Sequence, residues 1–146
     1  MDYRLQEEED AMVVQASVRH GLRRADPVEV EPRNYQPLSL SLRNSEHAIV
    51  GGLFGGTMWS WLMIDGLWID DALRGQGLGR QLLLRSEAIA VARGCRGAWL
   101  GTFDFQARGF YERHGYTVFA ALPDFPAGHT HYHLRKDLGS TSVAVT

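Results

Sequence analysis

The first half of the chain alternates between apolar and polar positions in a way that predicts β-strands. Between residues 36 and 43, Leu38, Leu40 and Leu42 fall on one face, while serine and arginine occupy the other. This period of two is typical of a strand with one buried face. A second strand is expected at residues 48–54, after a short polar turn.

Residues 58–69 form a dense apolar stretch that contains three tryptophans among long or branched side chains. Such a run predicts a buried central strand. The Asp65-Gly66 pair interrupts the run, which indicates a bulge at this point. Trp59, Trp61 and Trp68 are expected mainly in the core.

Helices are predicted at residues 8–24, 75–93 and 106–114. In the second of these, Leu78 and Leu82 begin an apolar stripe along one face. Glycines at positions 94 and 115 end the second and third helices. Further short strands are expected at residues 2–5, 98–102, 116–122 and 129–136.

The resulting order along the chain is β-α-β-β-β-α-β-α-β-β. It indicates an α+β or mixed α/β fold, in which helices flank a mixed sheet. A chain of 146 residues is the size of one domain. We therefore expect a single domain over residues 1–138 and a C-terminal tail at 139–146.

Composition narrows the class of protein. The chain carries 15 basic and 17 acidic side chains, for a net charge of −2, and no basic block, which disfavours nucleic-acid binding. Cys95 is the only cysteine, so an internal disulfide cannot form. The acidic N-terminal segment is not typical of a signal peptide, and no apolar stretch approaches the roughly 20 residues of a membrane helix. We therefore expect a cytoplasmic protein without nucleic-acid or membrane partners.

The glycine-rich stretch at residues 69–80 predicts an anion-binding turn between a strand and a helix. Free N–H groups at a helix start, together with the helix dipole, favour phosphate, and glycine lets the backbone approach it closely. Arg74 and Arg80 add positive charge. The P-loop pattern fails because Gly79 is followed by Arg80-Gln81, and the dinucleotide pattern fails because its last small position is Arg80.

The remaining pattern, Arg-Gly-Gln-Gly-Leu-Gly at residues 74–79, resembles the pyrophosphate-binding motif of the GNAT superfamily of acetyl-CoA-dependent N-acetyltransferases. A second stretch, residues 107–116, resembles the downstream A-x-x-F-Y-x-x-x-G-F/Y segment of that family. Both motifs lie in register with the predicted strands, and the element order matches from about residue 35 to 136. Residues 61–70, 103–111 and 126–129 also resemble a small bacterial subgroup of the family.

The resemblance implies that acetyl-CoA is bound without a metal ion. The central strand would hold the pantetheine arm through its backbone, and one strand N–H would stabilise the oxyanion of the reacting carbonyl. The turn would hold the diphosphate. Asp104 stands where many family members carry an asparagine that contacts the cofactor, and a carboxylate near the pantetheine arm could bind the substrate amine instead. The implied cofactor-binding residues are Leu67, Trp68, Ile69, Arg74, Gly75, Gln76, Gly77, Leu78, Gly79, Arg80 and Asp104.

The resemblance also implies direct attack of an amine on the thioester, without an acyl-enzyme. Tyr111 matches the tyrosine that family members often use as the general acid toward the departing thiolate. A base is needed as well, because an ammonium must lose a proton before attack. Asp65 is the candidate, since a carboxylate inside an apolar strand would have a raised pKa. Cys95 lies in no Cys/His motif and is expected to be an inert thiol.

The sequence indicates the residues that contact the acceptor less specifically than those that contact the cofactor. Trp59 and Trp61 share a face of the predicted strand and could line an acceptor pocket, and His129 could face the substrate. His129, His131 and His133 alternate along one strand. Their shared face could form a proton relay, a metal site or a partly exposed strand surface.

Three functions remain open on these grounds. The first is an N-acetyltransferase acting on an amine of a small molecule or a peptide. The second is a non-catalytic acyl-CoA-binding sensor module, and the third is a nucleotide or dinucleotide binder. Family members are often dimers, so a homodimer is compatible with the resemblance.

Overall fold

The computed structural model describes residues 1–139, and it divides the chain into two compact units, Met1–Pro32 and Arg33–Thr146. Apart from Gly139, the predicted tail at 139–146 lies outside the described residues. None of the helices in the described part of the chain has both the length and the apolarity to cross a membrane.

The first unit contains helix α1, Ala11–Arg24. The helix begins later than the predicted residue 8 because Asp10 has an extended backbone and caps it: the Asp10 carboxylate accepts a hydrogen bond from the Met12 N–H at 3.0 Å. Residues 2–5 were predicted to form a strand, and this is wrong. They pair with no neighbouring strand, and an isolated extended segment leaves its backbone groups without partners.

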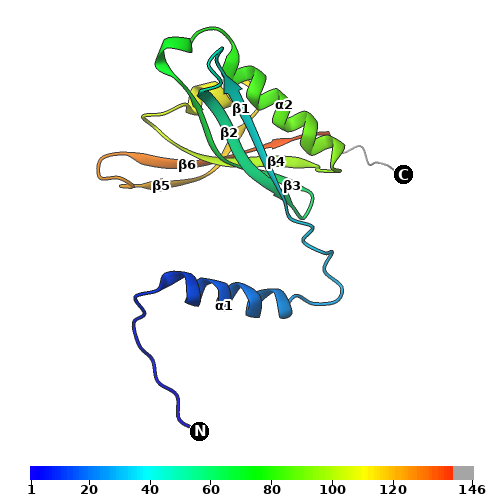
Figure 1. Cartoon of the computed structure of the whole chain (residues 1–146), viewed down its shortest axis with the longest axis vertical. Coiled ribbons are helices and arrows are strands. Elements are labelled where there is room, and N and C mark those ends of the chain that lie inside the picture. The colour runs from blue at the N-terminus through cyan, green and yellow to red at the C-terminus, as the bar shows by residue number, and fades with distance from the viewer. Residues whose placement is uncertain (140–146) are drawn as a thin grey trace. The chain divides into compact units, whose positions relative to one another are not determined.

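The second unit is built on a six-stranded sheet in the order β1-β2-β3-β4-β6-β5 (Figure 1). The chain order within this unit is three strands, helix α2, strand β4, helix α3 and two more strands. The bounds are β1 Gln36–Arg43, β2 Ile49–Met58, β3 Trp61–Ile69, the short 3₁₀ turn η1 Asp71–Leu73, α2 Leu78–Ala92, β4 Gly97–Phe103, α3 Arg108–Arg113, β5 Thr117–Pro123 and β6 Thr130–Asp137.

The sheet is mixed, as predicted. Strands β3 and β4 run parallel to each other, and all other neighbours are antiparallel. Leu38 is buried and the serines of β1 are exposed, so the predicted alternation of this strand is confirmed. The α+β fold predicted from the sequence is therefore correct.

The apolar run at residues 58–69 is not one strand. A two-residue turn at Trp59 and Ser60 separates β2 from β3, and both residues have positive φ angles, 50° and 61°. Hairpin turns of this kind usually carry glycine or asparagine, so the tryptophan and serine gave no turn signal. Because Trp59 lies in the turn, it does not share a strand face with Trp61.

The bulge predicted at Asp65-Gly66 is present. Phe54 of β2 pairs with Gly66 and Gly55 pairs with Ile64, which leaves Asp65 without a partner across the pair. Asp65 is exposed, so the expected burial of its carboxylate is wrong. The extra residue turns this side chain out of the apolar strand.

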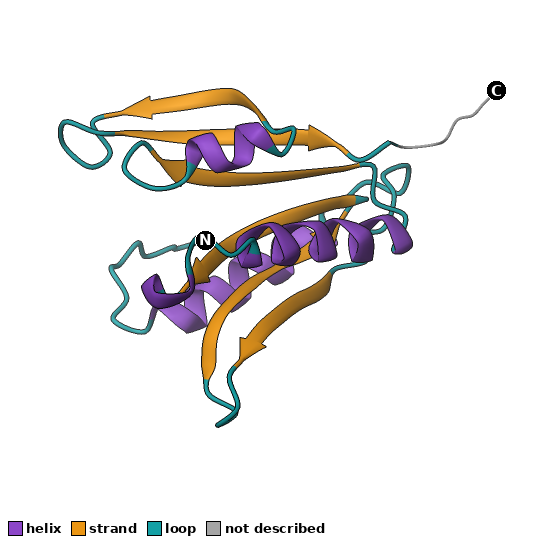
Figure 2. Cartoon of the chain, turned by 90° about the horizontal axis from the view of Figure 1, so that it is seen from above, coloured by secondary structure: helices purple, strands orange, loops and turns teal. Residues whose placement is uncertain are grey.

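Strands β3 and β4 pair over only half of their length. The parallel ladder joins Trp61–Ile64 to Gly97–Leu100 and stops there. Beyond this point, the sheet continues as two groups of three strands, β1–β3 and β4–β6–β5, which separate from each other in Figure 2. Residues 65–69 of β3 therefore face residues 101–103 of β4 without pairing with them.

Helix α2 packs against β1, β2 and β3. Its C-terminal end follows the prediction, because Gly94 adopts the left-handed conformation, at φ 87°, that ends helices. The hydrophobic core joins residues from the strands, α2 and α3. Its buried members are Leu38, Leu53, Leu62, Ile64, Leu82, Leu83, Ala90, Cys95, Ala98, Leu100, Tyr111, Tyr116 and Leu134.

A buried polar network ties α2 to the last strands. The Glu87 carboxylate accepts a hydrogen bond from the Tyr116 hydroxyl at 2.8 Å and forms an ion pair with the Lys136 ammonium, also at 2.8 Å. Lys136 is the only lysine of the chain. Burial and the neighbouring carboxylate raise the pKa of Tyr116, so its hydroxyl stays protonated and donates.

Replacing Lys136 by methionine is expected to destabilise the protein by about 2 kcal/mol, because Glu87 keeps its charge but loses its cation. Urea unfolding at neutral pH measures the change. The double variant, Lys136→Met with Glu87→Gln, removes both charges and should recover most of the loss. Equal unfolding free energies for the wild type and Lys136→Met would show that the pair contributes nothing.

Candidate active site

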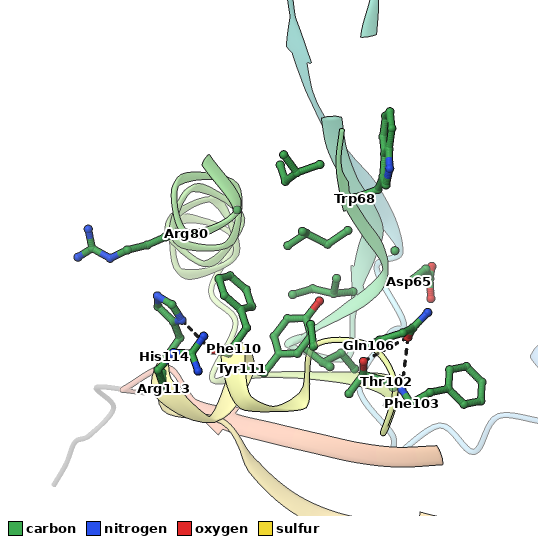
Figure 3. A pocket seen from close by; sticks show the side chains of 18 of the residues that line it. Asp65, Trp68, Arg80, Thr102, Phe103, Gln106, Phe110, Tyr111, Arg113 and His114 are labelled. Atoms are coloured by element: carbon green, nitrogen blue, oxygen red, sulfur yellow. Dashed lines mark hydrogen bonds between the residues drawn. The ribbon is translucent and has the colours of Figure 1, made fainter. Parts of the chain in front are cut away.

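A cavity of about 1170 Å³ opens where β3 and β4 separate. It is lined by residues 63–69 of β3, the turn that leads into α2, residues 99–103 of β4, and α3. His131 and His133 of β6 complete the lining. Figure 3 shows this cavity with β3 on one side and α2 and α3 on the other.

The glycine-rich turn leaves backbone N–H groups open at one end of the cavity. Gly75 and Gly77 have positive φ angles of 83° and 77°, and for this reason α2 begins at Leu78 rather than at residue 75. Gly77 caps the helix without any side-chain hydrogen bond. Chain neighbours aside, a Cβ at Gly75 or Gly77 would meet no atom of residues 1–139 within 4 Å. The turn therefore offers helix-start amides to open space, which fits a diphosphate.

The two turn arginines play different parts. Arg74 forms an ion pair with Asp71 at 3.0 Å, and its Nε donates to the Ile69 carbonyl at 3.3 Å, so it holds the turn in shape. Arg80 lines the cavity, but its side chain extends from α2 on the side away from β3 (Figure 3). Arg113 of α3 and the next residue, His114, lie on the same side as Arg80 in Figure 3, and the two arginines give this end of the cavity a cationic character.

The backbone of β3 forms one long wall of the cavity. Leu67, Trp68 and Ile69 line it, and β2 pairs with only one edge of these residues. The other edge faces β4 beyond the end of their ladder. An extended chain that carries amide groups, such as pantetheine, could form hydrogen bonds with this edge as an added strand does.

Tyr111 is buried in the core, yet its hydroxyl reaches the cavity. Its ring packs edge-on against Phe110 and Tyr116, with centroid distances of 5.2 and 5.8 Å. The hydroxyl points into the cavity in Figure 3, and no hydrogen-bond partner for it exists within residues 1–139. Burial raises the pKa of Tyr111, which keeps the phenol protonated as a proton donor must be.

Asp65 lies at the end of the cavity opposite the arginines (Figure 3). Gln106, which the sequence analysis did not single out, lies beside it. The Gln106 side-chain oxygen accepts hydrogen bonds from the Phe103 N–H and the Thr102 hydroxyl, both at 3.3 Å. This fixes the amide so that its nitrogen points toward Asp65 in Figure 3.

Five of the residues proposed from the sequence do not line the cavity: Gln76, Asp104, Trp59, Trp61 and His129. The carboxylate of Asp104 closes the loop before β6, since it accepts hydrogen bonds from the Thr130 N–H at 3.0 Å and contacts the His129 ring nitrogen at 2.9 Å. Arg33 stacks on Trp59 and Arg135 stacks on Trp61, at 4.6 and 5.0 Å.

His129 is held by Asp104 and also lies outside the cavity lining. Its neighbours two and four residues on, His131 and His133, do line it. The period of two therefore places two of the three histidines in the lining, and a contact of His129 with the substrate stays a prediction. Residues 1–139 contain no cluster of three or more His, Cys, Asp or Glu side chains arranged to hold a metal ion.

Cys95 is buried between α2 and β4 and does not line the cavity. Burial raises the pKa of its thiol, and the nearby Arg93 charge offsets this only in part. The thiolate that a nucleophilic mechanism would need is therefore disfavoured.

Comparison with known proteins agrees with this geometry. The acetyltransferase (GNAT) family matches residues 9–116. Blasticidin-S acetyltransferase of Streptomyces morookaense is 48% identical over 91 residues, which cover 62% of this chain and 67% of that protein. The crystal structure of an acetyltransferase from Agrobacterium tumefaciens superposes with a TM-score of 0.82 at 31% identity, covering 94% of this chain and 99% of that one.

A more distant structure, a streptothricin acetyltransferase from Bacillus anthracis, was solved in complex with acetyl coenzyme A. It shares the fold at a TM-score of 0.62 and 17% identity, over 73% of this chain and 64% of that one. The chain belongs to the GNAT family of acetyltransferases. Acetyl-CoA is the acetyl donor of this family.

Proposed function

We propose that this protein transfers the acetyl group of acetyl-CoA to an amine nitrogen of a small molecule or peptide, by direct attack of the amine. One observation carries the proposal. The open amides of the glycine-rich turn lie along the same cavity as the Tyr111 hydroxyl, which has no hydrogen-bond partner among residues 1–139, and this cavity opens where the pairing of β3 and β4 ends.

Different lining residues would bind different parts of acetyl-CoA. The amides of the turn at residues 74–80 would bind the diphosphate, with Arg113 adding positive charge nearby. The free edge of residues 67–69 would bind the pantetheine arm. Bound in this way, acetyl-CoA supplies an activated thioester. Tyr111 would then donate its proton to the departing sulfur, which makes the thiol a better leaving group.

The opposite end of the cavity suits a cationic acceptor. Asp65 is the one carboxylate among the lining residues that the structure describes, and it is exposed. We propose that it attracts the ammonium form of the acceptor rather than acting as a buried base. Trp59, Trp61 and His129 would contact only those acceptor parts that reach beyond the cavity.

We propose that residues 1–138 act as one acetyltransferase domain. The family match runs from residue 9 to 116 and thus continues across the boundary between the two compact units.

The names of the relatives suggest the first acceptors to test. A 48% identical relative is named for blasticidin S, and a protein of the same fold is named for streptothricin. We therefore propose a small polar amine, of the size of such antibiotics, as the acceptor. The alternative is a sensor that binds acetyl-CoA without turnover. It is favoured by Asp104, which replaces the asparagine of many family members and whose carboxylate contacts His129 and Thr130.

A thiol-release assay separates the two functions. Blasticidin S, streptothricin, an aminoglycoside, spermidine and a peptide with a free N-terminus are each offered with acetyl-CoA. The proposal expects free CoA to form in equal amount with one acetylated amine. Calorimetric binding of acetyl-CoA without thiol release from any of these acceptors would indicate the sensor instead.

A further inference from the structure

The imidazole of His131 occupies a fixed place in the wall of the cavity. Its ring lies against the backbone of Gly101, where an added Cβ would lie 2.8 Å from both Cε1 and Nε2 of the ring. Phe103 and Phe125 flank it at centroid distances of 4.5 and 5.7 Å, and His133 lies edge-on at 4.8 Å. These neighbours fix the position of the ring without binding its nitrogens.

His131 differs in this respect from two other histidines of the same region. His129 contacts Asp104, and the ring of His114 is hydrogen-bonded to the Phe110 carbonyl at 2.8 Å. The ring nitrogens of His131 have no hydrogen-bond partner in the part of the chain that the structure describes. A nitrogen lone pair is therefore available to a molecule in the cavity.

The charged and titratable groups around His131 are few. On its own strand, His133 faces it and Arg135 lies farther along, over Trp61. Strand β4 contributes the uncharged Gly101 and Phe103, and the loop before β6 contributes Phe125. Asp65 lines the same cavity from β3. Burial and the neighbouring His133 lower the pKa of His131, so the ring is neutral at physiological pH.

On the basis of the proposed acetyl transfer, we propose that His131 is the general base that deprotonates the acceptor ammonium. A ring nitrogen of His131 takes one proton from the ammonium. The freed lone pair forms the C–N bond to the thioester carbonyl carbon, the C–S bond breaks, and the sulfur receives a proton from Tyr111. After the C–N bond forms, the nitrogen loses a second proton to water. The proton on His131 also passes to water, and Tyr111 regains its own from water, so two protons are released, one is taken up, and one net proton is released per amide formed.

His131 fits this role better than Asp65 does. An exposed carboxylate is a weak base at neutral pH, whereas a neutral imidazole has a basicity close to the working pH. The two groups can act together, because the carboxylate attracts the cation and the imidazole removes its proton. Trp99, Phe103 and Phe105 also line this cavity and give the ammonium aromatic faces to pack on.

The test compares His131→Gln with His133→Gln, using the amine that reacts fastest in the thiol-release panel. We expect kcat/KM of His131→Gln to fall about a hundredfold near pH 7, since general bases contribute 10² to 10⁴ in rate. In the wild type, kcat/KM should fall as the pH drops below about 6.5, and we call this fall the acid limb of the pH profile. The acid limb should disappear in His131→Gln. His133→Gln should keep this limb. His47→Asn, on the distant β1–β2 turn, controls for the loss of a histidine and should match the wild type.

Two further variants distinguish a base from a structural residue. Adding imidazole to His131→Ala should restore part of the rate. Gly101→Ala should displace the imidazole of His131 without removing it. This variant should therefore lower the rate and retain the acid limb. Circular dichroism and acetyl-CoA titration should show each variant folded and able to bind acetyl-CoA.

If His131→Gln shows wild-type turnover and an unchanged acid limb, the assignment of His131 as the base is overturned, whereas the proposed acetyl transfer is not. Loss of the limb in His133→Gln instead would move the role to that residue and overturn it too. Absence of turnover in the wild type with every amine of the panel would overturn both this assignment and the proposed acetyl transfer.

Discussion

Replacing Gly77 by valine is expected to weaken acetyl-CoA binding by roughly a hundredfold. Gly77 has a φ angle of 77°, a conformation that costs a β-branched residue about 1–2 kcal/mol. Its Cβ would enter the open space beside the turn, which we assign to the diphosphate. The loss of two charge-assisted hydrogen bonds, at about 1.5 kcal/mol each, gives this magnitude.

Gly94→Val is the matched control. Gly94 also has a positive φ angle, 87°, and open space around its Cβ, but it lies at the far end of α2 and does not line the cavity. Both variants should lose similar stability, and calorimetry should show weakened acetyl-CoA binding for Gly77→Val only. Normal affinity of Gly77→Val would mean that the turn does not approach the diphosphate.

The second large effect is expected from Tyr111→Phe, which removes one hydroxyl and preserves the packing of the ring. We expect kcat to fall about a hundredfold, because general acids contribute 10² to 10⁴ in rate. The affinity for acetyl-CoA should change little. Since burial raises the pKa of Tyr111, its ionisation should produce no loss of wild-type activity below about pH 10.

Tyr116→Phe provides the comparison for Tyr111→Phe. Tyr116 is also buried, but its hydroxyl donates to Glu87, and it does not line the cavity. This variant should lose about 1–2 kcal/mol of stability and keep its turnover. If Tyr111→Phe retains full kcat in steady-state assays, Tyr111 has no part in proton transfer.

Much of the fold could be predicted because the relevant signals are local. The alternation of Leu38, Leu40 and Leu42 marked β1, and the Asp65-Gly66 pair marked the bulge. The glycines of the turn likewise indicated where β3 ends, although α2 begins at Leu78 and not at the predicted residue 75. Each of these signals acts within a few residues, where backbone preference and side-chain period decide the structure.

The differences from the sequence-based expectations arose where no local signal was present or where distant segments meet. The turn at Trp59-Ser60 carries no glycine or asparagine, and the bulge exposes a carboxylate that the apolar sequence around it suggested was buried. The carboxylate of Asp104 contacts Thr130 and His129, which are close in space but 25 or more residues away in the sequence. The aromatic rings around His131 come from Phe103 of β4, His133 of β6 and Phe125 of the loop before β6, and no spacing in the sequence predicts that they meet.

The central claim is that the cavity between β3 and β4 holds acetyl-CoA from the glycine-rich turn to Tyr111. A crystal structure of the protein with acetyl-CoA tests it most directly. We expect the diphosphate within hydrogen-bond distance of the turn amides, the pantetheine arm along residues 67–69, and the sulfur beside the Tyr111 hydroxyl. A diphosphate bound away from the turn, or a sulfur that does not approach Tyr111, would contradict the claim.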